Sequence, residues 1–182
     1  MNIFCLHEDP KESAKMMCDK HVVKMILESA QLLCTAHREL DVSCNILPNI
    51  DKVLYKSTHK NHPSAKWVRE SAYNYRWLYL HFVALNDEYK LRYNKKVNHK
   101  SFDRLNDFLK NPPDNAPLNK IGTLPTPAMP DYCKIDGDVV ASYRKYYILE
   151  KKDIATWKSP SKAPTWFINE TEKKRKDLRK KS

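Results

Sequence analysis

Apolar side chains recur at helical spacing over most of the chain. From Pro10 to about Leu40 they return every three or four residues, which predicts a long helix with a kink near Asp19. Asp9 and Glu12 suit its start, because an aspartate N-cap, a proline at the first position and a capping-box glutamate are typical of helix N-termini. The side chains expected to be buried on this helix are Val22, Met25 or Ile26, Leu32 or Leu33, and Ala36.

A second apolar and aromatic pattern predicts another long helix from about Asn61 to Asn94. Residues 101–109 predict a short helix, and Asp138 is placed to cap a last one. Residues 112–130 contain six of the 11 prolines. They favour an extended connection, because each proline blocks helix formation.

These elements define the expected fold. Residues 1–6 favour a short strand or an extended arm, and residues 41–58 favour a loop. We predict a mainly α, compact single-domain helical fold with a short N-terminal extended segment and a long Pro-rich connection. The helical domain is expected over residues 1–170, and a basic, disordered tail over residues 171–182.

The charge balance indicates a polyanionic partner. The 182 residues include 33 Lys and Arg against 22 Asp and Glu, which gives a formal net charge of +11. The last ten residues hold seven basic side chains and one acidic one, so the rest of the chain still carries +5. We therefore expect nucleic acid as the leading partner, while the tail either assists DNA binding or only aids solubility.

Several classes of protein are excluded by what the sequence lacks. With only two glycines, it has no Gly-rich phosphate loop, which excludes dinucleotide-binding and kinase-type sites. No apolar run is long enough to span a bilayer, and the first residues do not form a secretory signal. Five cysteines without regular spacing indicate reduced thiols. A cytoplasmic location with no membrane partner is expected.

The first long helix carries a candidate chemical face. His21, Lys24, Glu28 and Gln31 follow at steps of three, four and three residues, so they share one side of the helix. A carboxylate flanked by cationic groups suits general acid/base catalysis, or the stabilisation of an oxocarbenium-like centre. The alternative is a solvated face on which Lys24 and Glu28 form an ordinary i,i+4 ion pair.

Two Cys and His pairs have spacings that suit metal ligands, Cys18 with His21 and Cys34 with His37. The pairs begin 16 residues apart, about 24 Å along a continuous helix, so they cannot share one ion. Cysteine more often fills buried space. We therefore expect no metal and no cofactor, and a zinc-dependent module ranks as a third reading.

Aromatic and basic residues alternate in the last predicted helix. Around Arg144 and Lys145, tyrosines suit stacking on bases beside phosphate contacts. The alternative is that Tyr143 and Tyr147 belong to the core while both basic side chains lie in water. Trp166 is expected to anchor the C-terminal segment against the rest of the molecule.

Taken together, these residues resemble a known family. Asp19 and His21, a glutamate seven residues after the histidine, His62 at the start of an aromatic-rich helix, and a Pro-Thr-Trp-aromatic run from Pro164 occur in the order of that family. It is the group of phage-type pyrimidine-dimer DNA glycosylase/AP lyases, often called endonuclease V. The resemblance touches most of residues 1–167, with insertions in the loops and a longer Pro-rich connection.

The resemblance implies an enzyme that bends double-stranded DNA and flips a damaged base out of the stack. In this family an N-terminal α-amine attacks the sugar carbon C1′, expels the base and forms an imine that undergoes β-elimination. An α-amine ordinarily has a pKa of about 8, so a useful fraction is neutral near pH 7. Glu28 matches the family's catalytic carboxylate.

Position 2 departs from the family, in which removal of the initiator Met exposes a small residue. Here Asn2 is too bulky for that removal, so Met1 is expected to be retained and its amine to act as the nucleophile. The same departure leaves open a non-catalytic DNA-binding or accessory protein, or a base-modifying enzyme on the same scaffold.

The resulting prediction is a monomeric DNA glycosylase with associated AP-lyase activity on damaged or modified duplex DNA. Its predicted catalytic groups are Met1 and Glu28. The residues predicted to bind DNA are His21, Lys24, Lys20, His62, Lys66, Arg69, Arg144, Lys145 and Trp166.

Overall fold

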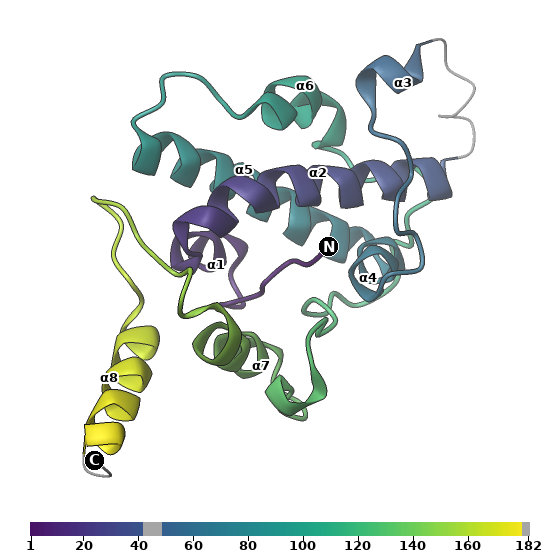
Figure 1. Cartoon of the computed structure of the whole chain (residues 1–182). Helices are drawn as coiled ribbons and strands as arrows, with labels where there is room; N and C mark the ends of the chain where they lie inside the picture. Colours follow the sequence, from purple (N-terminus) through teal and green to yellow (C-terminus); the bar gives the residue numbers. More distant parts are fainter. Residues whose placement is uncertain (42–48, 180–182) are drawn as a thin grey trace.

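Helices make up the regular structure of the described chain. The computed structural model describes residues 1–41 and 49–179, and within these ranges it contains no strand. The helices are α1 (Pro10–Met16), α2 (Asp19–Leu40), α3 (Ile50–Val53), α4 (Pro63–Glu70), α5 (Ala72–Tyr93), α6 (Lys100–Leu109), α7 (Val139–Tyr146) and α8 (Thr165–Arg179). The prediction of a mainly α fold is confirmed (Figure 1).

The first predicted helix is two helices, α1 and α2, rather than one kinked helix. Asp9 caps α1 as predicted, and its carboxylate accepts from the backbone N–H groups of Lys11 and Glu12. The helix then stops at Met17, whose backbone is extended. The backbone N–H at the start of α2 donates to Thr156 O, so a distant segment stabilises the break.

The second predicted helix is also divided, into α4 and α5. Ser71 has extended backbone angles and caps α5, because its hydroxyl accepts from the N–H of Asn74. The next backbone N–H, of Ala72, donates to Pro117 O in the Pro-rich connection. A single helix from residue 61 to residue 94 is therefore wrong. At each break, a distant carbonyl accepts from a backbone N–H that would otherwise lack a partner at the start of the new helix.

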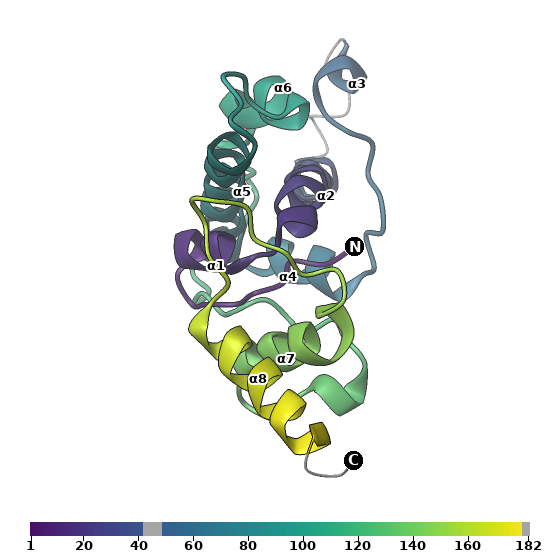
Figure 2. The ribbon, with the colours of Figure 1, turned by 60° about the vertical axis from the view of Figure 1, so that its left-hand side comes forward.

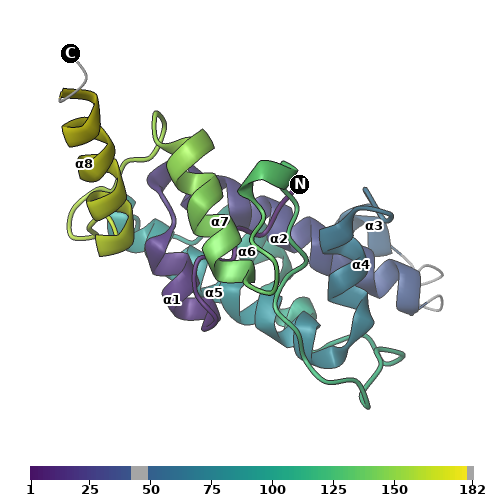
Figure 3. The same ribbon diagram turned by 90° about the horizontal axis from the view of Figure 1, so that it is seen from below.

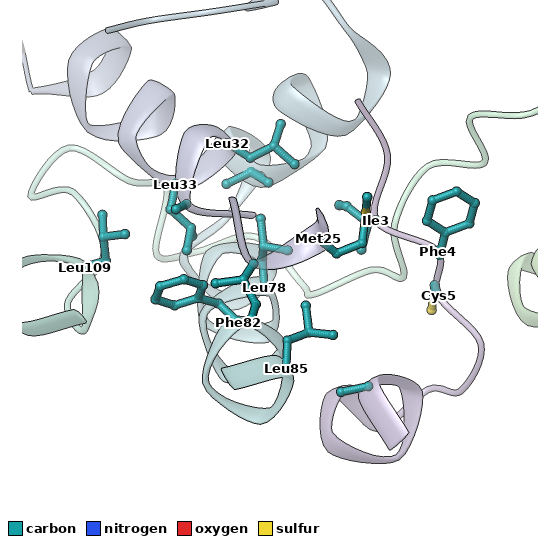
Figure 4. Close-up of a cluster of buried hydrophobic side chains, with 14 of the residues drawn as sticks. Ile3, Phe4, Cys5, Met25, Leu32, Leu33, Leu78, Phe82, Leu85 and Leu109 are labelled. Atoms are coloured by element: carbon teal, nitrogen blue, oxygen red, sulfur yellow. The ribbon is translucent and has the colours of Figure 1, made fainter. Parts of the chain in front are cut away.

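The core lies where α2 packs on α5, and α1 also packs along α5 (Figure 1). All the residues expected to be buried on α2 are at most 1% exposed. Figure 4 shows Leu33 of α2 beside Leu78 and Phe82 of α5. Each such side chain contributes about 1.5–3 kcal/mol when it is fully buried.

The first residues form an extended arm that passes between α2 and α7 (Figure 1). Ile3, Phe4, Cys5 and Leu6 are buried, so the arm is part of the core. The arm carries the chain terminus to the side of the molecule where the segment between α3 and α4 runs past α2 (Figure 2). Arg38 holds that segment, donating through Nε to Tyr55 O at 2.7 Å.

The last part of the chain is less regular. Residues 112–130 contain no helix, as the prolines predict, and α7 continues into a π-helical turn over Tyr147–Lys151. Helix α8 projects from one end of the molecule (Figure 3) and crosses residue 170, where the sequence places the start of a tail. Its Lys, Arg and Glu residues are good helix formers. No helix of the described residues has the length and apolar character needed to span a membrane.

Candidate active site

The chain terminus and a carboxylate of α2 meet in one pocket. The Met1 α-amine lies 4.0 Å from Oε2 of Glu28. The backbone N–H of Asn2 donates a hydrogen bond of 2.9 Å to the same oxygen. Two successive backbone nitrogens therefore face one carboxylate oxygen, and the first of them is an amine.

Helix α2 presents Glu28 because the residues that precede it on the inner face, Met25 and Ile26, are buried against the core. Lys24 lies one turn earlier on the outer face, and its Nζ is 3.4 Å from Oε1 of Glu28. The Glu28 side chain is 12% exposed, whereas that of Lys24 is 67% exposed. The carboxylate thus has a cation on its solvent side and the chain terminus on its other side.

The pocket has a volume of about 460 Å³ and walls from three parts of the chain. Its lining residues are Met1, Asn2 and Phe4 of the arm, Lys20, His21, Lys24, Met25 and Glu28 of α2, and Ala128, Tyr146, Lys151 and Ile154. Three lysines and the terminal amine outnumber the single carboxylate in this lining. Such a positive pocket suits a ligand that carries phosphate groups.

His21 is a neutral side chain in this pocket. Its Nδ1 lies 2.5 Å from the hydroxyl of Tyr147, and its ring stacks on Phe4 at 4.2 Å between centroids. Burial lowers the pKa of His21 to about 4, and the charges of Lys151 and Lys24 add to the effect. At pH 7 the imidazole is therefore a hydrogen-bonding group and not a cation.

The predicted residues on and next to α4, His62, Lys66 and Arg69, do not line the pocket. His62 caps α4, since its Nδ1 accepts from the N–H of Ser64 at 3.2 Å. Its pKa is lowered mainly by burial and next by the charged chain terminus, while Glu28 opposes the shift. These influences indicate that His62 is near the terminus. Lys66 is exposed on the same helix, and Arg69 donates to Lys60 O at 2.7 Å.

The predicted residues of the C-terminal part have mainly internal contacts. Arg144 donates through Nε to Leu6 O at 3.0 Å, and its guanidinium lies 5.4 Å from the centre of the Trp166 ring. Trp166 also packs on Tyr147 and anchors the start of α8, as expected. Lys145 is half-buried. The structure does not bring these three into the pocket lining.

Sequence reasoning missed the residues that close the pocket opposite α2. Tyr146 stacks on Phe4, with ring planes 13° apart, and Lys151 lies with Nζ 4.6 Å from the centre of the Tyr146 ring. Both belong to the tyrosine-rich run that suggested base stacking, but the residues chosen from it were Arg144 and Lys145. The tyrosine-rich run was therefore the signal in the sequence that could have found them. The π-helical turn changes the helical spacing, so the sequence alone does not show which side chains of the run share a face.

The two Cys and His pairs with metal-ligand spacing lie on α2 or at its N-cap. Among them, no three His, Cys, Asp or Glu side chains are grouped to hold a metal ion. Cys18 and Cys34 are buried. His37 instead contacts the hydroxyl of Tyr75 through Nε2, at 2.9 Å.

Comparison with known proteins identifies the N-terminal part of the chain. A family model described as pyrimidine dimer DNA glycosylase matches residues 1–101. The match includes Met1, His21, Glu28 and His62, and it ends before the Pro-rich connection. Searches of curated proteins and of solved structures gave no match.

Proposed function

The chain belongs to the pyrimidine dimer DNA glycosylase family, and from that premise we propose that it is a glycosylase with AP-lyase activity on damaged or modified bases in duplex DNA. Family membership implies a DNA glycosylase, with DNA as substrate. The finer proposal is an imine mechanism that uses the Met1 α-amine and the Glu28 carboxylate. It is carried by one observation, the 4.0 Å separation of these two groups inside a positively charged pocket.

The reaction begins with the neutral amine at C1′ of a flipped nucleotide. The nitrogen lone pair forms the N–C1′ bond, the C1′–base bond breaks, and the base leaves with the bonding electrons and a proton. We propose that Glu28 accepts the two protons that the nitrogen loses in turn, and passes one to the departing base and the other to O4′. Opening of the sugar ring then gives a C=N bond, and O4′ takes up a proton to become a hydroxyl.

Strand cleavage follows from the imine. A base removes a proton from C2′, the electron pair forms the C2′–C3′ double bond, and the C3′–O bond breaks with loss of the 3′ phosphate. We assign this proton transfer to Glu28 as well, because it is the one carboxylate in the described pocket lining. We propose that Lys20, Lys24 and Lys151 contact the flanking phosphates, because all three line the pocket. The enzyme is proposed to act as a monomer without a cofactor.

Reductive trapping tests the proposal directly. The protein is incubated with an abasic-site duplex and borohydride, and the labelled peptide is mapped by mass spectrometry. We expect a covalent adduct on Met1. If the initiator is removed in the cell, the label moves to the Asn2 amine, which intact mass reveals.

Two controls make the result interpretable. Undamaged duplex and omission of borohydride should both abolish the adduct, while a duplex with a single pyrimidine dimer should yield it. Labelling of Lys20, Lys24 or Lys151 would reject the amine assignment. Salt-dependent DNA binding without any adduct or cleavage would instead favour the accessory DNA-binding protein.

A further inference from the structure

Asn2 makes an unusual number of hydrogen bonds for a residue next to a chain terminus. Besides its backbone bond to Glu28, its side-chain Nδ2 donates to Ala128 O at 2.7 Å. Its Oδ1 accepts from the backbone N–H groups of Ile3 and Phe4, at 2.8 and 3.3 Å. Both ends of the amide are therefore used, one within the arm and one far along the chain.

The contacts within the arm fix a turn that directs the terminus. Phe4 has a φ of 55°, in the left-handed region that side chains other than glycine rarely adopt. The Oδ1 bonds of Asn2 hold this turn, and the ring of Phe4 is packed against His21 and Tyr146. Because the turn lies only two residues beyond Asn2, its geometry sets the direction in which Met1 leaves the core.

The hydrogen bond from Asn2 to Ala128 O joins the arm to a part of the Pro-rich connection that is itself held in place. Ala128 N–H donates to the hydroxyl of Tyr143, which itself donates to Thr126 O, both at 3.3 Å. Tyr143 is fully buried in α7. Pro127 and Pro130 also restrict the backbone on either side of Ala128. The Asn2 amide is thus tied across 126 residues to an anchored carbonyl.

We propose that Asn2 is a positioning residue that holds the terminal amine over Glu28 by bridging the arm and the Pro-rich connection. The inference rests on the proposed amine mechanism. It also requires an amide: a carboxylate lacks the donor for Ala128 O, and an alkyl side chain lacks both functions. The family match ends at residue 101, so this bridge joins the matched part to the part beyond it.

The kinetic test compares Asn2→Leu and Asn2→Asp with an exposed control on α8, Asn169→Leu. Residue 2 stays large in both variants, and intact mass verifies that Met1 is retained. Borohydride trapping is measured in single turnover over a range of abasic-duplex concentrations. We expect Asn2→Leu to lower the maximal rate about 10- to 100-fold, since small misplacements of a reacting group have effects of this size. The half-saturating concentration should stay within about threefold.

The maximal trapping rate and the half-saturating DNA concentration together show whether Asn2 positions the amine. An unchanged maximal rate, or a loss confined to half-saturation, would overturn positioning. A double variant adds a second readout: because Tyr143→Phe loosens Ala128, it should slow trapping on its own, yet slow Asn2→Leu no further. Additive effects would show that the two residues do not act through one bridge.

Hydrogen exchange keeps the test valid even where no adduct forms. Asn2→Leu should speed amide exchange at Ile3 and Phe4, whereas Asn2→Asp should preserve protection there because it retains an acceptor oxygen. Unchanged exchange in Asn2→Leu would show that the Oδ1 bonds of Asn2 do not hold the turn of the arm. Absence of trapping by the unsubstituted protein would reject the proposed function instead, so the two failures are distinguishable.

Discussion

The part of the chain matched by the family, residues 1–101, and the part beyond it contribute differently to the pocket. The first supplies the amine of Met1, the carboxylate of Glu28 and two lysines. The second supplies a wall, which includes the ring of Tyr146 and the cation of Lys151. The groups proposed to react therefore lie in the matched part, whereas contacts between residues far apart in sequence close the pocket. We infer that the first part supplies the reacting groups, and that the second part helps to position them and to hold DNA.

The largest effect is expected from Glu28→Gln. The substitution preserves shape but removes the base, so strand cleavage should fall by about 10²- to 10⁴-fold. DNA affinity should be retained, because the lysines of the pocket are untouched. Glu39→Gln is the matched control, since Glu39 lies on the same helix and pairs with Ser57 and Lys60 away from the pocket. Cleavage that survives in Glu28→Gln would refute the division of roles.

The next effect concerns the stability of the N-terminal part in acid. His81 of α5 is fully buried, its Nδ1 lies 2.8 Å from Pro10 O, and burial lowers its pKa to about 4. Because the unfolded histidine titrates near pH 6.5, the stabilising effect of neutral His81 is complete above that pH. It is lost as the pH falls toward 4. Between pH 7 and pH 5 the free energy of unfolding should drop by about 2 kcal/mol from this group.

His81→Asn isolates that contribution. Its amide nitrogen replaces the Nδ1 donor but does not titrate, so the loss of stability between pH 7 and pH 5 should shrink. Urea unfolding at both pH values measures the difference. His21, whose pKa is also lowered to about 4, should account for part of what remains. Equal pH dependence in the two proteins would mean that His81 does not titrate differently on folding.

The same division explains what the sequence could predict. Helical spacing placed the buried face of α2 and grouped His21, Lys24 and Glu28, because those relations are local. The break at Cys18 was predicted only as a kink near Asp19, and the break at Ser71 was missed, because their backbone partners, Thr156 and Pro117, are far along the chain. The catalytic role of the first residue came from the resemblance and stays a prediction.

Loss of the basic C-terminus should have a smaller effect, on affinity alone. A chain that ends at Glu172 lacks seven basic residues but keeps the start of α8, where Phe167 packs on Trp157. Binding to undamaged duplex at low salt should weaken about tenfold, with a shallower dependence on salt. The trapping rate at saturating DNA should not change. A lower saturated rate would assign the tail a part in the chemistry.

The smallest effect, and the sharpest test of the second part, is expected from Lys151→Met. Lys151 lines the pocket, whereas Lys152 is exposed and does not, so Lys152→Met is a control with the same change of charge. If Lys151 contacts one phosphate, its loss should weaken DNA binding about threefold. The slope of log affinity against log salt concentration should also fall by about one.

The pKa of His21 gives a second measurement, which distinguishes the position of Lys151 from its contribution to the net charge. The charge of Lys151 helps to hold the pKa of His21 down, so Lys151→Met should raise that pKa from about 4. An NMR titration of the imidazole measures the change, and Lys152→Met should leave it nearly unaffected, because that side chain points into solvent where salt screens it. If both variants shift His21 and DNA binding equally, the second part acts only through its net charge. A difference between them would show that the π-helical turn places one particular cation in the pocket.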